Sequence, residues 1–301
     1  MNMKTSFKFF GLLVLWVMVA LPISGQTLEK SLLWEISGNG LSKPSYLFGT
    51  YHLLTNEYLE KEHPGAFAKF KASENVVVEM VIDTPAMMKS QMHMLMLQNK
   101  LSALLDSATY RLLKNELKEQ MGVDAAMFEQ VKPMAINTIL SMRYAQAASP
   151  ELSQYGGVPM DLYFARQGAA TRKNITALET IEEQMIMLYD HFSIQEQALQ
   201  LTELLTNKDK NLSISAELVG LYRDKNIQGM YDIGKRMEQE MPSFGSLNFL
   251  TVDRNKPWSQ KLPSLMQAGS QFIAVGALHL PGPDGLIDLL RKQGYTVRPV
   301  L

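Results

Sequence analysis

The chain contains no cysteine among its 301 residues. It therefore cannot form a disulfide, use a thiol as a nucleophile or carry the acylated cysteine of a bacterial lipoprotein. It also lacks the His-Glu-x-x-His segment of the commonest zinc peptidases and the Gly-x-Ser-x-Gly elbow of serine hydrolases. Acidic and basic residues balance to a formal net charge of -1, and no run of Lys or Arg forms a phosphate-binding stripe. We therefore predict that nucleic acid is not a partner.

The amino-terminal residues follow the plan of a secretory signal. Lys4 and Lys8 precede an apolar run from Phe9 to Leu21, after which come a proline and small residues. The run is shorter than the ~20 residues that a membrane-spanning helix needs. We predict a signal peptide over residues 1–26 and an exported, soluble protein, periplasmic or secreted, with no membrane anchor after cleavage. An uncleaved anchor is the alternative, because the cleavage pattern is weak.

Apolar and β-branched runs predict strands near both ends of the chain. The predicted strands are Ser31–Ile36, Ser45–Gly49, Asn75–Ile82, Asn174–Leu178, Gln271–Val275 and Tyr295–Val300. In the middle of the chain, apolar residues recur at helical spacing, for example at Ile136, Leu140 and Tyr144. We predict one α/β domain over residues 27–301, built on a central mixed, partly parallel β-sheet formed from both ends of the chain. A large α-helical insertion is expected at about residues 85–265.

Glycine and proline mark two connections of the predicted sheet. Gly38-Asn39-Gly40 supplies the positive φ angles of a tight turn between the first two strands. Pro283-Asp284-Gly285 and Gly294 bound a helix between the last two strands. That strand, helix, strand order favours parallel pairing of the last two strands.

The chain has 20 methionines, and several of them fall close together. The clustered residues are Met80, Met87, Met88, Met92, Met94 and Met96. Thioethers can bind copper, but they also fill irregular cores, and we interpret the cluster as core packing.

Two histidines follow predicted strands in the same way. In Gly49-Thr50-Tyr51-His52 and Gly276-Ala277-Leu278-His279, an apolar run ends in glycine and histidine comes three residues later. The glycine permits a close backbone approach, so the histidine can turn toward a crevice at the strand ends. A lone strand-end histidine is usually structural, but two of the chain's five histidines occupy matching positions. The remaining histidines, which lack a second ligand at useful spacing, are His63, His93 and His191.

Glu79 stands in the otherwise apolar run Val76–Val81. A buried carboxylate is costly unless a cation, a metal or a strong donor lies nearby. One interpretation is an internal ion pair with an arginine such as Arg254. The other is a metal site, because two imidazoles and one carboxylate suit a divalent transition metal with an open water position. Such a metal lowers the pKa of bound water and polarises a carbonyl, which indicates hydrolysis.

The ordered set of motifs resembles one known family. The two Gly-x-x-His segments, Glu79, Leu178-Glu179-Thr180 and Asp253-Arg254-Asn255 are together similar to the TraB/GumN family, which includes the Tiki proteins of animals. The resemblance implies an erythromycin-esterase/ChaN-like (EreA/ChaN-like) fold with both histidines and the glutamate at the active centre. Tiki proteins are regarded as metal-dependent peptidases that cleave secreted proteins, with manganese or cobalt as activating ions. Related folds include an esterase and a haem-binding protein.

The resemblance also assigns roles to residues of this chain. His52, Glu79 and His279 match the metal or catalytic positions, and Arg254 matches a basic residue of the site. The resemblance thus implies a divalent transition metal, with manganese or cobalt favoured and zinc or iron as alternatives.

Three acidic residues are further candidates for positions close to the metal ligands. Glu179 either supports those ligands or simply favours the positive start of a helix. Asp253, beside the basic residue of the site, is expected to support the ligands as well. Asp161 resembles a family position near a turn, but we favour the interpretation that it caps a helix.

The sequence therefore predicts an exported metal-dependent hydrolase, with a peptidase as the favoured activity. In this hypothesis His52, Glu79 and His279 hold an ion that activates water against a peptide or protein substrate, and Arg254 stabilises the developing negative charge. The competing hypothesis is a non-catalytic periplasmic protein that binds a small ligand, a metal or haem in the same crevice.

Overall fold

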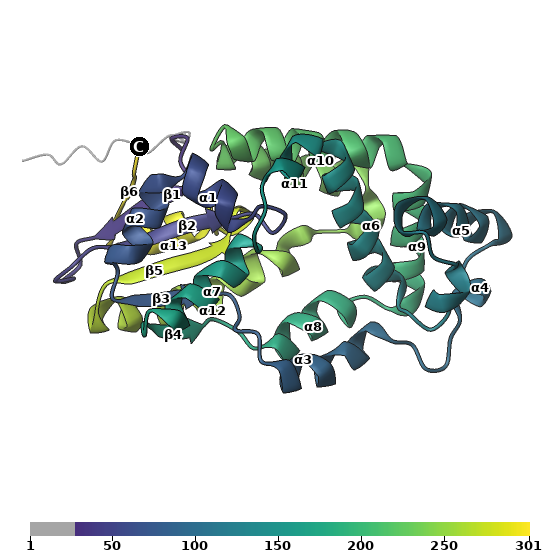
Figure 1. The fold of residues 1–301 in the computed structure, drawn as a ribbon, viewed down its shortest axis with the longest axis horizontal. Helices are drawn as coiled ribbons and strands as arrows, with labels where there is room; N and C mark the ends of the chain where they lie inside the picture. The colour runs from purple at the N-terminus through teal and green to yellow at the C-terminus, as the bar shows by residue number, and fades with distance from the viewer. Residues whose placement is uncertain (1–27) are drawn as a thin grey trace, which may run out of the picture.

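The computed structural model describes residues 28–301, which form an α/β fold around a six-stranded mixed sheet (Figure 1). The predicted signal over residues 1–26 lies outside the described residues. The strands follow the order β4-β3-β5-β2-β1-β6 across the sheet. Their bounds are β1 Leu33–Ser37, β2 Ser45–Thr50, β3 Asn75–Val78, β4 Asn174–Ala177, β5 Gln271–Gly276 and β6 Thr296–Pro299.

Helices make up most of the remaining described chain. They are α1 Asn56–Glu62, α2 Pro64–Ala72, α3 Thr84–Ser90, α4 Leu101–Leu104, α5 Ser107–Met121, α6 Pro133–Ala148, α7 Met160–Ala170, α8 Ile181–Tyr189, α9 Ile194–Thr206, α10 Lys208–Arg223, α11 Ile227–Glu240, α12 Val252–Ala268 and α13 Leu286–Lys292. A short 3-10 turn, η6, spans Ala277–His279 directly after β5. It therefore carries the second Gly-x-x-His segment.

The central strands of the sheet run parallel. β3 pairs in parallel with β4 and with β5, and β5 pairs in parallel with β2. β1 is antiparallel to β2, and Gly38, Asn39 and Gly40 in their hairpin have φ angles of 78°, 46° and 79°. These pairings confirm the predicted mixed, partly parallel sheet and its tight turn. They also bring the carboxyl ends of β2, β3, β4 and β5 to one edge.

The expected pairing of the last two strands is wrong. β6 pairs antiparallel with β1, so that Val297 lies opposite Ile36. β5 and β6 run in the same direction, but β2 and β1 lie between them. Since β3 and β2 already pair with both edges of β5, the chain leaving α13 reaches the free edge of β1 instead.

The strand predicted over Asn75–Ile82 is also shorter than expected. β3 ends at Val78, and Val81 and Ile82 are 41% and 44% exposed. The parallel ladders with β4 and β5 both stop at Val78, opposite Ala177 and Ala274. Glu79 therefore lies at the end of the strand rather than inside it.

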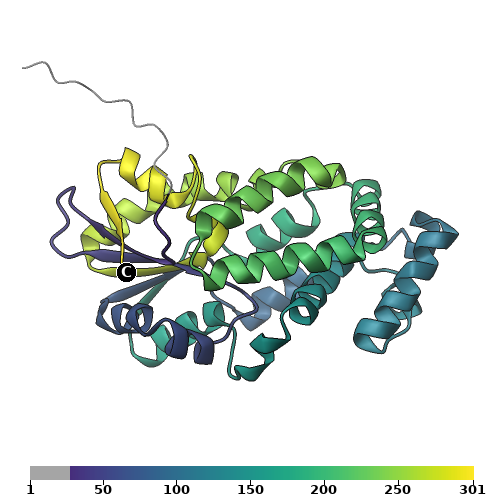
Figure 2. The ribbon, with the colours of Figure 1, turned by 90° about the horizontal axis from the view of Figure 1, so that it is seen from above.

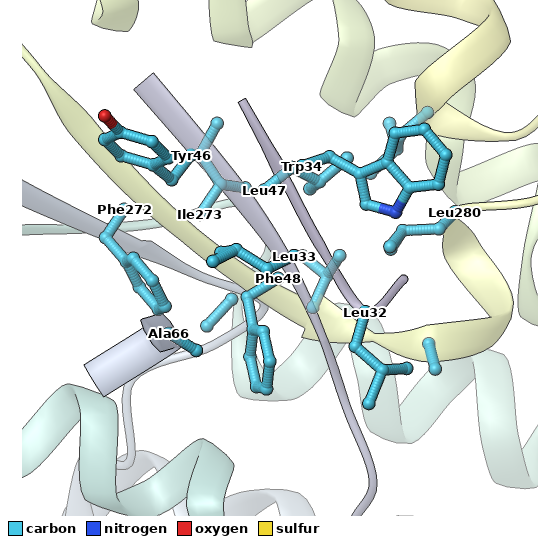
Figure 3. Close-up of a cluster of buried hydrophobic side chains, with 14 of the residues drawn as sticks. Leu32, Leu33, Trp34, Tyr46, Leu47, Phe48, Ala66, Phe272, Ile273 and Leu280 are labelled. Atoms are coloured by element: carbon cyan, nitrogen blue, oxygen red, sulfur yellow. The ribbon is translucent and has the colours of Figure 1, made fainter. Parts of the chain in front are cut away.

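Helices cover both faces of the sheet. On one face the rings of Phe70 in α2 and Phe164 in α7 lie 5.2 Å apart, and Phe164 packs 4.9 Å from Phe272 of β5. Figure 3 shows Phe48 and Phe272 pointing toward the side on which Ala66 of α2 lies. On the opposite face α12 and α13 pack together against the sheet, which is thus buried between two helical layers.

A second hydrophobic core lies within the helices on one side of the sheet (Figures 1 and 2). Ile136, Leu140 and Tyr144 of α6 belong to it, as their helical spacing predicts. Residues 85–265 contain most of the helices and also β4, which forms the outer edge of the sheet where a strand over Asn174–Leu178 is predicted. No helix within residues 28–301 is long and apolar enough to cross a membrane.

The methionine cluster does not fill a core. Met96 is 4% exposed, but Met88 and Met92 are 68% and 55% exposed. Met88 lies in α3 and Met92 in the 3-10 turn Gln91–Met94; these two segments pack against each other and against α8, but leave both side chains exposed. The interpretation as core packing is therefore correct for Met96 and wrong for Met88 and Met92.

Candidate active site

An ionisable residue follows each of four parallel strands at the same edge of the sheet. His52 comes two residues after β2, Glu79 directly after β3, Glu179 two residues after β4 and His279 three residues after β5. The Glu179 backbone amide donates to the Glu79 carbonyl over 2.9 Å, which extends the pairing of their strands. The parallel topology thus gathers residues that lie far apart in the sequence.

Glu79 is almost fully enclosed and makes three kinds of polar contact. Its Oε1 atom accepts a 2.7 Å hydrogen bond from the Gly276 backbone amide. Its Oε2 atom lies 2.5 Å from Nη2 of Arg254 and 3.4 Å from the amide of Gln184. A Cβ atom at position 276 would lie 3.3 Å from Oε1, which explains why glycine stands at this strand end.

Arg254, in the first turn of α12, bridges the two buried glutamates. Besides its contact with Glu79, its Nη2 lies 2.5 Å from Glu179 Oε1 and its Nε lies 3.1 Å from Glu179 Oε2. Its guanidinium also stacks on Trp258, one helical turn later, at 4.6 Å from the ring centre. The ion pair between Glu79 and Arg254, one of the two sequence interpretations, is therefore present.

The tautomer of His279 follows from its neighbour Asn255. The Asn255 amide nitrogen donates to the carbonyls of His279 and Asp284 over 3.1 and 2.9 Å, so its Oδ1 must be the acceptor for His279 Nδ1 at 2.7 Å. The proton is thus on Nδ1, and Nε2 carries the lone pair. This Nε2 accepts from Arg254 Nη1 over 3.0 Å and lies 3.7 Å from Glu79 Oε1.

Burial and charge push the pKa values in this cluster apart. Burial favours the neutral form of Glu79, but the nearby imidazoles, Arg254 and the Gly276 amide lower its pKa to about 2. Burial lowers the pKa of His279 to about 4, so at neutral pH Arg254 is the cation that compensates Glu79. Burial raises the pKa of Glu179, against the opposing effect of Arg254.

His52 is held by Asp161 from the first turn of α7. Its Nδ1 lies 2.9 Å from Asp161 Oδ2, and the other carboxylate oxygen of Asp161 accepts from the Thr50 hydroxyl. The charge of Asp161 raises the pKa of His52 above its usual range. The predicted capping role of Asp161 is wrong, because its carboxylate turns toward the end of β2 and orients His52.

The remaining candidates differ in their positions. Asp253 is exposed and, among the described residues, takes no part in the hydrogen bonds of the cluster. The prediction that Asp253 supports the metal ligands is therefore wrong. No role for Gln184, Asn255 or Trp258 is predicted from the sequence, although Asn255 belongs to the Asp253-Arg254-Asn255 motif. Asn255 directly follows Arg254 and Trp258 lies four residues beyond it, so helical spacing on α12 was a usable signal for Trp258.

A small cavity lies beside Asn255. Its volume is about 130 Å³, and residues of the loop after η6, including Pro281 and Pro283, form part of its lining together with Tyr231 of α11. The proline-rich loop after the second Gly-x-x-His segment therefore shapes a cavity next to the residue that orients His279.

The donor chemistry of the cluster suits a divalent transition metal. His52 and His279 are each held through Nδ1 by a side-chain oxygen, as metal-binding imidazoles commonly are. Because Asp161 raises the pKa of His52 to about 9, His52 must lose a proton before its Nε2 can bind an ion. Glu79 adds a carboxylate that is ionised at neutral pH. Within residues 28–301 no group of three or more His, Asp or Glu side chains forms a preassembled metal site. Binding of an ion by these three residues requires Arg254 to move away from His279 Nε2.

Comparison with known proteins identifies the family of the chain. The TraB/PrgY/gumN family model matches residues 32–299. The chain is a member of the TraB/PrgY/gumN family. The matched region contains all six strands and every residue of the strand-end cluster, and it confirms the resemblance seen in the motifs. No solved structure matches this family member.

Curated relatives of this TraB/PrgY/gumN protein include vertebrate metalloproteases. It is 22% identical to Metalloprotease TIKI2 of Danio rerio over 325 residues, which cover 92% of this chain and 62% of the relative. It is 21% identical to Metalloprotease TIKI1 of Danio rerio over 316 residues, covering 89% and 62%. For Metalloprotease TIKI2 of Xenopus tropicalis, identity is 22% over 328 residues, covering 92% and 61%. The chain thus spans about three-fifths of the length of these relatives.

Proposed function

We propose that this protein is an exported, metal-dependent hydrolase that acts on peptide bonds. The observation that carries the proposal is the gathering of His52, Glu79 and His279 at the ends of parallel strands, with each imidazole oriented through Nδ1. The metalloprotease names of the vertebrate relatives support the same reaction class. The predicted signal and the EreA/ChaN-like form of the fold are parts of this proposal.

Each residue of the cluster has a physical role in the proposed reaction. His52, Glu79 and His279 would hold a divalent ion, with manganese or cobalt favoured and zinc or iron as alternatives. When bound, such an ion supplies a Lewis acid and lowers the pKa of water. Asp161 keeps His52 in a fixed orientation, and Arg254 would stabilise negative charge on the substrate carbonyl oxygen.

A panel of fluorogenic peptides, incubated with the purified protein and each of the four ions in turn, tests this function. We expect cleavage that one of the ions stimulates, that a chelator abolishes, and that His52→Ala and His279→Ala both reduce to background. His191→Ala is the matched control, because the His191 ring stacks on Phe249, with 4.3 Å between the ring centres, and His191 is not one of the three proposed metal ligands. That variant should cleave at the unaltered rate.

Two results would change the assignment. Full activity in His52→Ala or His279→Ala would show that the reaction, if present, takes place elsewhere. Stoichiometric retention of a metal or haem without cleavage of any peptide or ester would replace the hydrolase by a binding protein that uses the same crevice.

A further inference from the structure

A pocket of about 430 Å³ lies apart from the strand-end cluster. Three segments enclose it: the junction of α1 and α2, residues 152–155 before α7, and the turn between α10 and α11. Of the residues gathered at the strand ends, none lines this pocket. Its volume is far above the ~30 Å³ share of one water molecule and within the ~300–1,000 Å³ of small-molecule sites.

The floor of the pocket is buried and contains a nitrogen atom without a hydrogen-bond partner among the described residues. Tyr58 and His63 line it and are only 3% and 8% exposed. His63 Nε2 is buried and has no hydrogen-bond partner among the described residues. Around the imidazole stand the rings of Tyr58, Phe48 and Tyr222, at 5.5, 6.0 and 6.3 Å. Since aromatic rings offer it no conventional acceptor, a ligand in the pocket could satisfy this nitrogen.

The lining of the pocket includes exposed cations. Arg223 and Lys225 are both exposed, and the acidic residue in the lining, as far as the described residues show it, is Glu62. Glu62 already accepts a 2.9 Å hydrogen bond from the hydroxyl of Tyr155. Burial is the main cause that lowers the pKa of His63 to about 4, and the charge of Lys225 lowers it further. The charge of Lys225 therefore acts on the imidazole at the floor of the pocket.

We propose that this pocket binds a small organic anion with a flat apolar body. The carboxylate or phosphate of such a ligand would meet Lys225, and one of its oxygens would accept from His63 Nε2–H. Its apolar body would lie against the edge-to-face pair of Tyr58 and Tyr155, whose ring centres are 5.0 Å apart, and against Leu152. The proposal is independent of the hydrolase function, because the two sites share no lining residue.

Calorimetric titration and ¹³C-histidine spectra of the whole protein test the proposal. The probes are phenyl phosphate, benzoate, inorganic phosphate and the neutral benzyl alcohol. We expect phenyl phosphate or benzoate to bind saturably and to move the Cε1–Hε1 signal of His63, which His63→Phe identifies among five histidines. Inorganic phosphate and benzyl alcohol should bind at least about tenfold more weakly, because the first lacks the apolar body and the second lacks the anionic group.

Lys225→Gln is the decisive variant, and Arg172→Gln is its matched control. Lys225 and Arg172 both have a φ of 58°, but Arg172 does not line the pocket. We expect Lys225→Gln to weaken binding by about tenfold or more and Arg172→Gln to leave it within about twofold. Equal binding by Lys225→Gln, equal binding of benzyl alcohol, or a shift confined to other histidines would overturn the proposal. The absence of saturable binding up to about 10 mM of either aromatic anion would overturn it as well.

Discussion

Replacing Arg254 with methionine removes the guanidinium that bridges two buried carboxylates and keeps a side chain of similar length. Arg254, Glu79 and Glu179 have side chains that are 12%, 10% and 10% exposed, so solvent screens their charges weakly. Breaking a buried ion pair by removing one partner costs about 3–5 kcal/mol, because the remaining charge is left uncompensated. We therefore expect Arg254→Met to lower the free energy of unfolding at pH 7 by about 3–5 kcal/mol.

The pKa of Glu79 fixes the direction with pH. Because it is lowered from an ordinary 4.5 to about 2, the stability that the ionised carboxylate contributes is present above pH 4.5 and is lost as pH falls toward 2. Removing Arg254 takes away one of the charges that lower the pKa of Glu79, so this pKa rises, and protonation then relieves the uncompensated charge. The loss of stability in Arg254→Met should accordingly be smaller at pH 4 than at pH 7.

Urea unfolding at both pH values measures the effect, with Arg236→Met as the matched control. Arg236 pairs with Glu217 on the surface, where the two side chains are 42% and 45% exposed, so its replacement should cost at most about 1 kcal/mol. A loss in Arg254→Met no larger than in Arg236→Met would refute the reasoning. A larger loss at pH 4 than at pH 7 would refute it too.

Three further substitutions probe other parts of the structure. Gly49→Ala would place a Cβ atom 3.0 Å from the Cα of Ala277, and this overpacking should cost about 1–3 kcal/mol, measured by thermal unfolding. His63→Phe should reduce the loss of stability as pH falls from 6.5 to 4. In this range His63 binds a proton in the unfolded chain but stays neutral in the folded protein, and urea midpoints measured at several pH values check the effect. Asn255→Leu removes the acceptor that orients His279 and should weaken metal binding by about 10–100-fold, measured by competition with a chelating dye.

Local sequence patterns were sufficient for the elements that position the cluster. The valine run before Glu79 predicts a strand because β-branched residues pack well on a sheet buried on both faces. The glycines at 49 and 276 mark strand ends where a Cβ atom would meet Ala277 or Glu79. Each signal lies within a few residues of the feature that it predicts.

Features set by distant residues could not be predicted in this way. Asp161 reaches His52 across 109 positions of sequence, and its neighbours alone suggested a helix cap. β6 joins β1 because both edges of β5 are already paired, which no local pattern reveals. His63 has no second metal ligand at useful spacing in the sequence, and no local pattern reveals that the fold places it in one pocket with Lys225.

Elemental analysis of the purified protein after dialysis against manganese, cobalt, zinc and iron tests the central claim most directly. The unaltered protein and His191→Ala should retain close to one ion per chain, and the His52→Ala, His279→Ala double variant should retain none. Equal metal content in the double variant and the unaltered protein, with both folded, would contradict the assignment of the site.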